Sequence, residues 1–250
     1  MTAGIVCGCG ICGCGVSAVE TVFLSAVSDE FGAYRKRLRA VLNLPSVHVN
    51  AQPSPGDDEP GLVPLGTYVL ATVAGNVAGS RWVIHIVGDR TGSDASPESL
   101  DELRRIYPEL TSRLPQLPEL AEAFAGGDPH LTYTQIEALL AVALGKHLIV
   151  AVPTAVAPRG GPSSSDEEQR RQAAHLARLR RLRIHEMQFA GVDDLAIQVL
   201  RIVFEARYGE LAADGRAPGR PANLPYASLG SLFKGRDADM ERLAGLLEAA

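Results

Sequence analysis

The run Thr132-Tyr-Thr-Gln-Ile-Glu137 opens an apolar helix expected over residues 134–144, and His147-Leu-Ile-Val-Ala-Val-Pro153 follows at once as a strand. A continuously apolar strand is typical of a parallel sheet that is covered on both faces. The crevice at the carboxyl ends of such strands is where α/β sheets bind ligands. This order therefore puts one carboxylate, Glu137, at the start of a helix beside a candidate ligand crevice.

Strands and helices alternate on both sides of this stretch. Upstream, the pattern predicts a strand at 20–25, a helix that begins with Ser28 as its cap and ends at 43–45, a strand at 46–50, a helix-like stripe at 65–77 and a strand at 82–87. Downstream, it predicts a basic helix at 167–183, a strand at 186–189 and a helix capped by Asp193 or Asp194. Five such alternations indicate a doubly wound parallel sheet. Residues 51–64 are expected to be an exposed loop, and residues 93–131 a proline-punctuated insertion with a short helix near 100–107.

Composition and charge limit the classes of function. The chain has 250 residues, of which 46% are hydrophobic, so one sizeable core is expected. A net charge of -5 disfavours nucleic acid as a partner, although the arginine-rich helix at 167–183 can be either a solvated face or a partner surface. No apolar run is long enough to cross a bilayer and no positively charged signal opens the chain, which predicts a cytoplasmic protein without a membrane partner.

All four cysteines lie close together, at Cys7, Cys9, Cys12 and Cys14, between glycines. Four thiolates can hold a metal tetrahedrally, but structural zinc sites usually place two pairs far apart in the chain. The other interpretation is a flexible leader over residues 1–18, including one translated from a start codon placed too far upstream. We favour the leader, and we expect no metal and no disulfide in a cytosolic setting.

Three stretches, Val22–Phe31, Trp82–Gly92 and Tyr133–Pro153, together resemble a bacterial TIR-like domain over residues 19–207. The resemblance implies an α/β fold, a flavodoxin-like, TIR-type three-layer sandwich with a five-stranded parallel sheet. Domains of this family stand at the N-terminus of STAND-class signalling proteins, ahead of an NB-ARC ATPase module. The resemblance therefore implies that this chain is an effector domain of a bacterial immune receptor, active in antiviral defence.

A second stretch, Asn223–Asp237, looks like the segment that leads into an NB-ARC module. Residues 208–250 are therefore expected to be a linker and the start of an NB-ARC-type module that is otherwise missing. The chain contains no Gly-x-x-x-x-Gly-Lys-Ser/Thr phosphate loop, so we expect no ATP hydrolysis by it alone. The implied partners are a STAND/NB-ARC module, in cis or in trans, and further copies of the TIR-like domain.

The activity implied by the resemblance is cleavage of NAD at the bond between nicotinamide and ribose. Some TIR domains do this, with NAD as substrate and no cofactor, and others only assemble to pass on a signal. In the cleaving members a glutamate at the start of the helix after the third strand is essential, and Glu137 stands at that position. This sequence departs from the family pattern at Leu131 and Thr134, where the family has serine and cysteine, and at Tyr133, which replaces the usual tryptophan.

Two interpretations of Glu137 follow from the residues themselves. A carboxylate near a ribose stabilises the cation-like transition state of glycosidic cleavage. On the helix wheel, Glu137 lies at the rim of the apolar stripe, where it can face an open cleft. Alternatively, Thr134-x-x-Glu137 matches a capping box, in which the carboxylate bonds backbone N–H groups of its own helix.

The ends of the first and third strands supply the other candidate substrate-binding residues. They are Ser25, Ser28, Asp89 and Arg90, with Tyr133 and Thr134 beside Glu137. His85, inside an apolar strand, is predicted to be a satisfied core histidine. Three functions remain open: an NAD glycohydrolase, a non-enzymatic adaptor that self-associates, and a domain that senses nucleotides without turnover.

Overall fold

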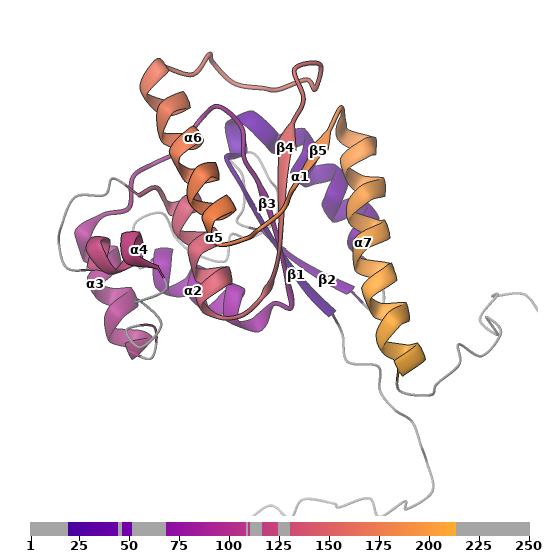
Figure 1. The fold of residues 1–250 in the computed structure, drawn as a ribbon, viewed down its shortest axis with the longest axis horizontal. Coiled ribbons are helices and arrows are strands. Elements are labelled where there is room, and N and C mark those ends of the chain that lie inside the picture. The colour runs from indigo at the N-terminus through magenta and orange to yellow at the C-terminus, as the bar shows by residue number, and fades with distance from the viewer. Residues whose placement is uncertain are drawn as a thin grey trace, which may run out of the picture. The chain divides into compact units, whose positions relative to one another are not determined.

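The computed structural model describes residues 20–44, 47–51, 69–108, 110, 117–124 and 131–213. They form an α/β fold around one sheet of five strands in the order β2-β1-β3-β4-β5, and every neighbouring pair is parallel (Figure 1). This is the flavodoxin-like order of a doubly wound sheet. The predicted fold class is therefore confirmed.

Each predicted strand and helix has a counterpart in the structure. The strands are β1 Glu20–Ala26, β2 Val47–Ala51, β3 Trp82–Ile86, β4 His147–Pro153 and β5 Glu186–Phe189. The helices are α1 Ser28–Leu42, α2 Val69–Gly79, α3 Pro97–Ile106, α4 Pro118–Phe124, α5 Tyr133–Ala143, α6 Asp166–Arg181 and α7 Val192–Ala213. Helix α4 was not predicted.

Helices cover both faces of the sheet. Helices α2, α5 and α6 lie on one face, and α1 and the first turns of α7 lie on the other (Figure 1). The chain leaves β1 toward the sheet edge at β2 and then returns to β3 on the opposite side of β1. The carboxyl ends of β1 and β3 therefore flank the topological switch point, which is the usual ligand position in open α/β sheets.

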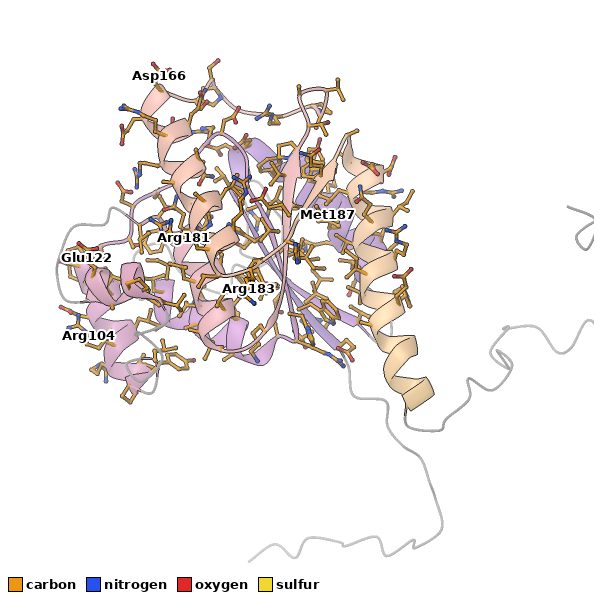
Figure 2. All side chains as sticks on the ribbon, viewed as in Figure 1. Arg104, Glu122, Asp166, Arg181, Arg183 and Met187 are labelled. Carbon is orange, nitrogen blue, oxygen red and sulfur yellow. The ribbon has the colours of Figure 1, made fainter. Side chains whose placement is uncertain are left out.

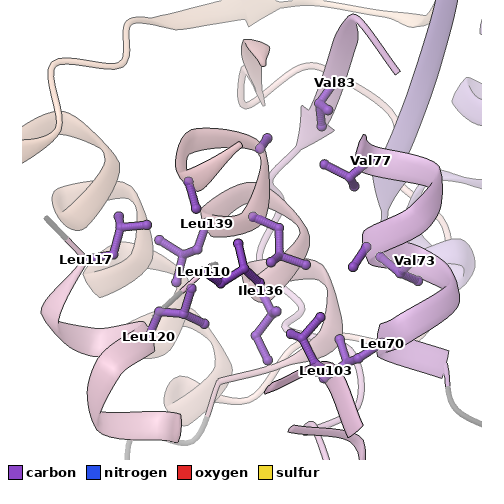
Figure 3. Packing of buried hydrophobic residues seen from close by; sticks show 14 of the residues in the cluster. Leu70, Val73, Val77, Val83, Leu103, Leu110, Leu117, Leu120, Ile136 and Leu139 are labelled. Atoms are coloured by element: carbon purple, nitrogen blue, oxygen red, sulfur yellow. The ribbon is translucent and has the colours of Figure 1, made fainter. Parts of the chain in front are cut away.

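The larger hydrophobic cluster lies between the sheet and helices α2 and α5, and the insertion adds to it. Leucines from the insertion pack into this cluster, which explains why a segment punctuated by proline still folds against the domain (Figure 3). Pro118 stands at the first position of α4, where proline is tolerated because a backbone N–H there would have no acceptor within the helix. The labelled members of the cluster are Leu70, Val73, Val77, Val83, Leu103, Leu110, Leu117, Leu120, Ile136 and Leu139.

The described surface carries charged side chains on the outer sides of the helices. Examples are Arg104 on α3, Glu122 on α4, and Asp166 and Arg181 on α6 (Figure 2). None of the described helices combines the length and apolar character that a bilayer-spanning segment requires.

The contacts within the chain divide it into two compact units, residues 1–200 and residues 201–250. In the second unit the described residues, 201–213, are helical. The expected leader at 1–18, its four cysteines and the segment 214–250 lie outside the described residues. Most of the expected loop at 51–64 does so as well, and the predicted boundary at residue 207 stays a prediction.

Truncating Phe23 tests whether the face under α2 and α5 holds the fold together. This side chain is fully buried on β1 within the larger cluster. We expect Phe23→Ala to lower the free energy of unfolding by about 3 to 5 kcal/mol, since it leaves a cavity. Urea denaturation followed by fluorescence of the single tryptophan, Trp82, measures this loss. Val156→Ala, at a side chain that is 78% exposed, should change stability by less than about 0.5 kcal/mol.

Candidate active site

The carboxyl ends of β1 and β3 carry the first two polar side chains of the site. Ser25 and His85 are register partners on these neighbouring strands, and the Ser25 Oγ lies 2.8 Å from the His85 Nδ1. Both side chains are buried, at 1% and 2% exposure. Each stands among apolar residues in the buried part of its strand, so both need polar partners inside the fold.

Helix α5 begins with a capping box, but not the one predicted. Thr132 is the N-cap, its Oγ1 accepts the N–H of Gln135, and the Gln135 side chain accepts the N–H of Thr132. The helix starts one position earlier than predicted, so the box is set by Thr132 and Gln135. The prediction of a Thr134-x-x-Glu137 box is therefore wrong, because Glu137 lies beyond the first turn and its carboxylate is not part of this cap.

Glu137 faces the interior instead. It is 3% exposed, because α5 is buried around most of its circumference, so the expected rim position facing an open cleft is also wrong. Burial raises the pKa of Glu137 to about 7, opposed by a hydrogen bond from Ser25 and by the positive charge of Arg35. A group with this pKa changes its protonation state near neutral pH, as general acids, general bases and charge-stabilising carboxylates do.

Arg35 was missed by the sequence analysis. It is 4% exposed and donates to the Ser28 Oγ. Ser28 was predicted as the N-cap of α1, but Val27 holds that position without a side-chain bond, and the Ser28 hydroxyl serves Arg35. The signal was available in the sequence, because Arg35 continues the buried stripe of Phe31, Leu38 and Leu42. A guanidinium on such a stripe needs a buried anion.

A second buried carboxylate braces the loop after β3. Glu30 accepts the backbone N–H of Asp89 at 3.0 Å and the N–H of Arg90 at 3.1 Å. Burial raises the pKa of Glu30, while these two N–H groups lower it. The carboxylate rests against Gly88, where a side chain would overlap it. The predicted residues Asp89 and Arg90 thus meet Glu30 through their backbones.

The side chains of Asp89 and Arg90 form ion pairs at the surface. Asp89 pairs with Arg159 at 2.5 Å and Arg90 with Asp29 at 3.3 Å. The Arg159 guanidinium also lies 3.9 Å from Glu30. Two cationic side chains therefore stand at the end of β3, each held by a partly or largely exposed carboxylate that a phosphate can replace at modest cost.

Tyr133 and Thr134, the two predicted binding residues in the first turn of α5, have structural partners. The Tyr133 hydroxyl lies 3.3 Å from the Ser99 Oγ in α3, and Thr134 donates to the Thr91 carbonyl at 3.1 Å. Thr134 thus ties the start of α5 to the loop after β3. Tyr133 is directed toward the insertion, and its predicted role in binding substrate stays a prediction.

A pair of amides connects α5 to α6. Gln135 donates to Gln172 at 3.1 Å, and Gln172 donates to the Arg90 carbonyl at 2.8 Å. Both glutamines are buried. This relay fixes the start of α5, the middle of α6 and the loop after β3 relative to one another, so the elements around Glu137 are held by internal bonds.

The arginines of α6 have acidic neighbours. Arg170 pairs with Glu167 at 2.7 Å, Arg180 with Glu186 at 2.7 Å, and Arg171 with Asp94. These contacts favour the interpretation of a solvated, internally balanced helix face. Among the described residues, no group of three or more histidine, cysteine, aspartate or glutamate side chains is arranged to hold a metal ion.

Comparison with known proteins adds little to this site. No family model matches the sequence, and no curated protein matches it. Among solved structures, the chain is similar to the CMP N-glycosidase of Clostridium botulinum, with 13% identity and a TM-score of 0.38. That match covers 72% of this chain and 97% of the other. A likeness this distant assigns neither a family nor a reaction to the chain.

Replacing Gly88 tests the Glu30 brace. In Gly88→Ala the new Cβ would overlap the Glu30 carboxyl group and displace it from two N–H donors. We expect a loss of about 2 to 4 kcal/mol in unfolding free energy. Gly32→Ala, in α1 with open space around the new Cβ, should be neutral or stabilising. Adding Glu30→Ala to Gly88→Ala should recover part of the loss, and strictly additive losses would contradict the brace.

The pH dependence of stability tests the burial of Glu137. Its pKa is raised from 4.5 to about 7 on folding, so between these values the unfolded state has lost a proton that the folded state keeps. Stability due to this group therefore falls as pH rises from about 4.5 to 7, by on the order of 3 kcal/mol. Glu137→Gln should gain that amount relative to the unsubstituted protein over this range, measured by urea denaturation from pH 4 to 8. A difference that stays constant with pH would contradict it.

Proposed function

We propose that this domain hydrolyses the bond between a base and its ribose in a nucleotide, with Glu137 as the carboxylate that stabilises the ribosyl cation. NAD is the first substrate we propose. The observation that carries the proposal is the position of Glu137, which is buried at the switch point, takes no part in a helix cap and has a pKa near 7. The fold supports the location, because open α/β sheets bind nucleotides there.

The reaction requires one carboxylate. In NAD, water adds to the ribose carbon while the bond to nicotinamide breaks, and nicotinamide leaves as a neutral base with the bonding electron pair. The water proton is released, and ADP-ribose is the second product. An ionised Glu137 in a low-dielectric site stabilises the positive charge that develops on the ribose. The cationic side chains Arg90 and Arg159 lie within the same strand-end region and suit the pyrophosphate.

Access to Glu137 requires a rearrangement. A side chain that is 3% exposed does not meet a dinucleotide in this conformation. We propose that self-association of the domain opens the site, so that activity depends on proximity of several copies. This agrees with the resemblance of the chain to TIR-like effector domains of bacterial STAND immune receptors, in which an NB-ARC module, in cis or in trans, would bring the copies together.

Nicotinamide release tests the proposal directly. The full chain, fused to a dimerising or higher-order tag, is incubated with NAD and with nucleoside monophosphates, and free base is measured by chromatography. We expect release from NAD, with Glu137→Gln lowering the rate at least about 100-fold. The control is Glu167→Gln, at an exposed glutamate on α6, which should retain full activity.

The outcomes separate the candidate functions. Equal release by Glu137→Gln and by the unsubstituted protein would overturn the proposal. Assembly with no loss of any base would instead support the non-enzymatic adaptor, and binding of a nucleotide without turnover, detected by calorimetry, would support the sensor.

A further inference from the structure

Three buried polar side chains lie in series behind Glu137. The Ser25 hydroxyl is the hydrogen-bonding group that lowers the pKa of Glu137 against the effect of burial, and the Ser25 Oγ lies 2.8 Å from the His85 Nδ1. The His85 Nε2 in turn lies 3.0 Å from the His175 Nε2 on α6. The two imidazole rings meet edge to face at 88°. At 2% and 0% exposure, neither histidine exchanges these contacts with bulk water in this conformation.

Both histidines are neutral near pH 7. Burial lowers the pKa of His85 to about 3. Burial also holds the pKa of His175 well below its usual range, and repulsion between a protonated His175 and the groups His85 and Arg178 lowers it further. A neutral imidazole has one nitrogen that donates and one that accepts. Since two Nε2 atoms face each other, one ring must carry its proton on Nε2 and the other on Nδ1.

The far end of the series selects one of the two possible directions. Within the described part of the chain, the His175 Nδ1 is buried and has no hydrogen-bond partner. A bare acceptor there is tolerated better than a bare N–H donor. His175 therefore carries its proton on Nε2 and donates to His85, and His85 carries its proton on Nδ1 and donates to Ser25.

The near end selects the same direction. Ser25 has a single hydrogen, and in this arrangement it donates that hydrogen to the Glu137 carboxylate. In the reverse direction the serine would donate to His85, and the ionised carboxylate would lose its donor. When Glu137 is ionised, both ends of the series therefore require the same hydrogen-bond direction, in which every donor points toward the carboxylate.

We infer that Ser25, His85 and His175 form a directed hydrogen-bond chain that orients Glu137 and stabilises its ionised form, so that Ser25 and His85 are positioning residues for this carboxylate. The inference about catalysis rests on the proposed function, whereas the direction of the chain does not. Arg35 is the other group that acts on Glu137, from α1, and its charge favours the same ionised form.

The first experiment reads the direction in the native protein. Nitrogen-15 NMR of the full chain labelled at histidine, at pH 8, identifies which ring nitrogen of each histidine bears hydrogen. His85→Phe and His175→Phe spectra assign the signals. We expect the proton on Nδ1 in His85 and on Nε2 in His175. The reversed tautomers, with the proton on Nε2 in His85 and on Nδ1 in His175, would overturn the inference. This result comes from the unsubstituted protein and does not depend on any variant being active.

The second experiment measures Glu137 itself. The infrared carbonyl band of the protonated carboxyl group, assigned by its loss in Glu137→Gln, is titrated from pH 5 to 9. Ser25→Ala should raise the pKa of Glu137 by about one unit, because the last donor is gone. The control is Ser80→Ala, another buried serine, whose hydroxyl donates to the Asn76 carbonyl in α2. An unchanged Glu137 titration in Ser25→Ala would overturn the inference.

The activity assay separates this inference from the proposed function. In Ser25→Ala the acidic limb of the profile of kcat/KM against pH should move upward with the carboxyl titration, which a loss of stability alone would not cause. If the tautomers and the titration are as expected but no nucleotide is cleaved, the directed hydrogen-bond chain is confirmed and the proposed function is wrong. If cleavage depends on Glu137 but the tautomers are reversed, the proposed function is supported and the directed hydrogen-bond chain is wrong.

Discussion

A carboxyl group buried between a sheet and its covering helix is the constraint on which the rest of this site depends. An uncompensated carboxylate there costs several kcal/mol. The structure offsets this for Glu137 with a hydroxyl from β1 and a guanidinium from α1. Ser25 lies in the buried, apolar part of β1 and His85 in that of β3, whereas Arg35 lies on the buried side of α1, a helix that is otherwise rich in charged residues. Three separate elements thus supply polar side chains to the surroundings of one group.

Glu30 presents the same problem with a different solution. Its carboxylate is held by two backbone N–H groups and by the absence of a side chain at Gly88. Backbone donors are fixed in place, so Glu30 ties α1 to the loop after β3. Side-chain donors such as Ser25 can rotate, which leaves Glu137 free to change its bonds during a reaction. Of the two acids, Glu30 is suited to bracing and Glu137 to chemistry.

The fold was predictable from local patterns, since apolar strands such as 147–153 and striped helices such as α1 are set by neighbours in the chain. Ser25 was also found this way, because it lies at the end of the first strand. Glu137 was nominated because it was expected at the start of a helix, whereas in the structure it lies beyond the first turn of α5. His175 and Gln172 were missed because their partners are far away in the sequence, whereas Arg35 was missed although its place on the buried stripe of α1 was readable from the spacing. The capping box was placed two residues too late because Thr132 and Thr134 offer the same chemistry, and only tertiary packing decides between them.

The contact between Gly88 and Glu30 also bears on how this domain can vary in evolution. Because the carboxylate fills the volume that a side chain at position 88 would need, the glycine cannot gain a side chain while the Glu30 carboxylate keeps its place. We expect relatives that carry a larger residue at the glycine to have a shorter one at the glutamate. A pairwise co-substitution across 57 intervening positions would be the trace of this packing in a family alignment.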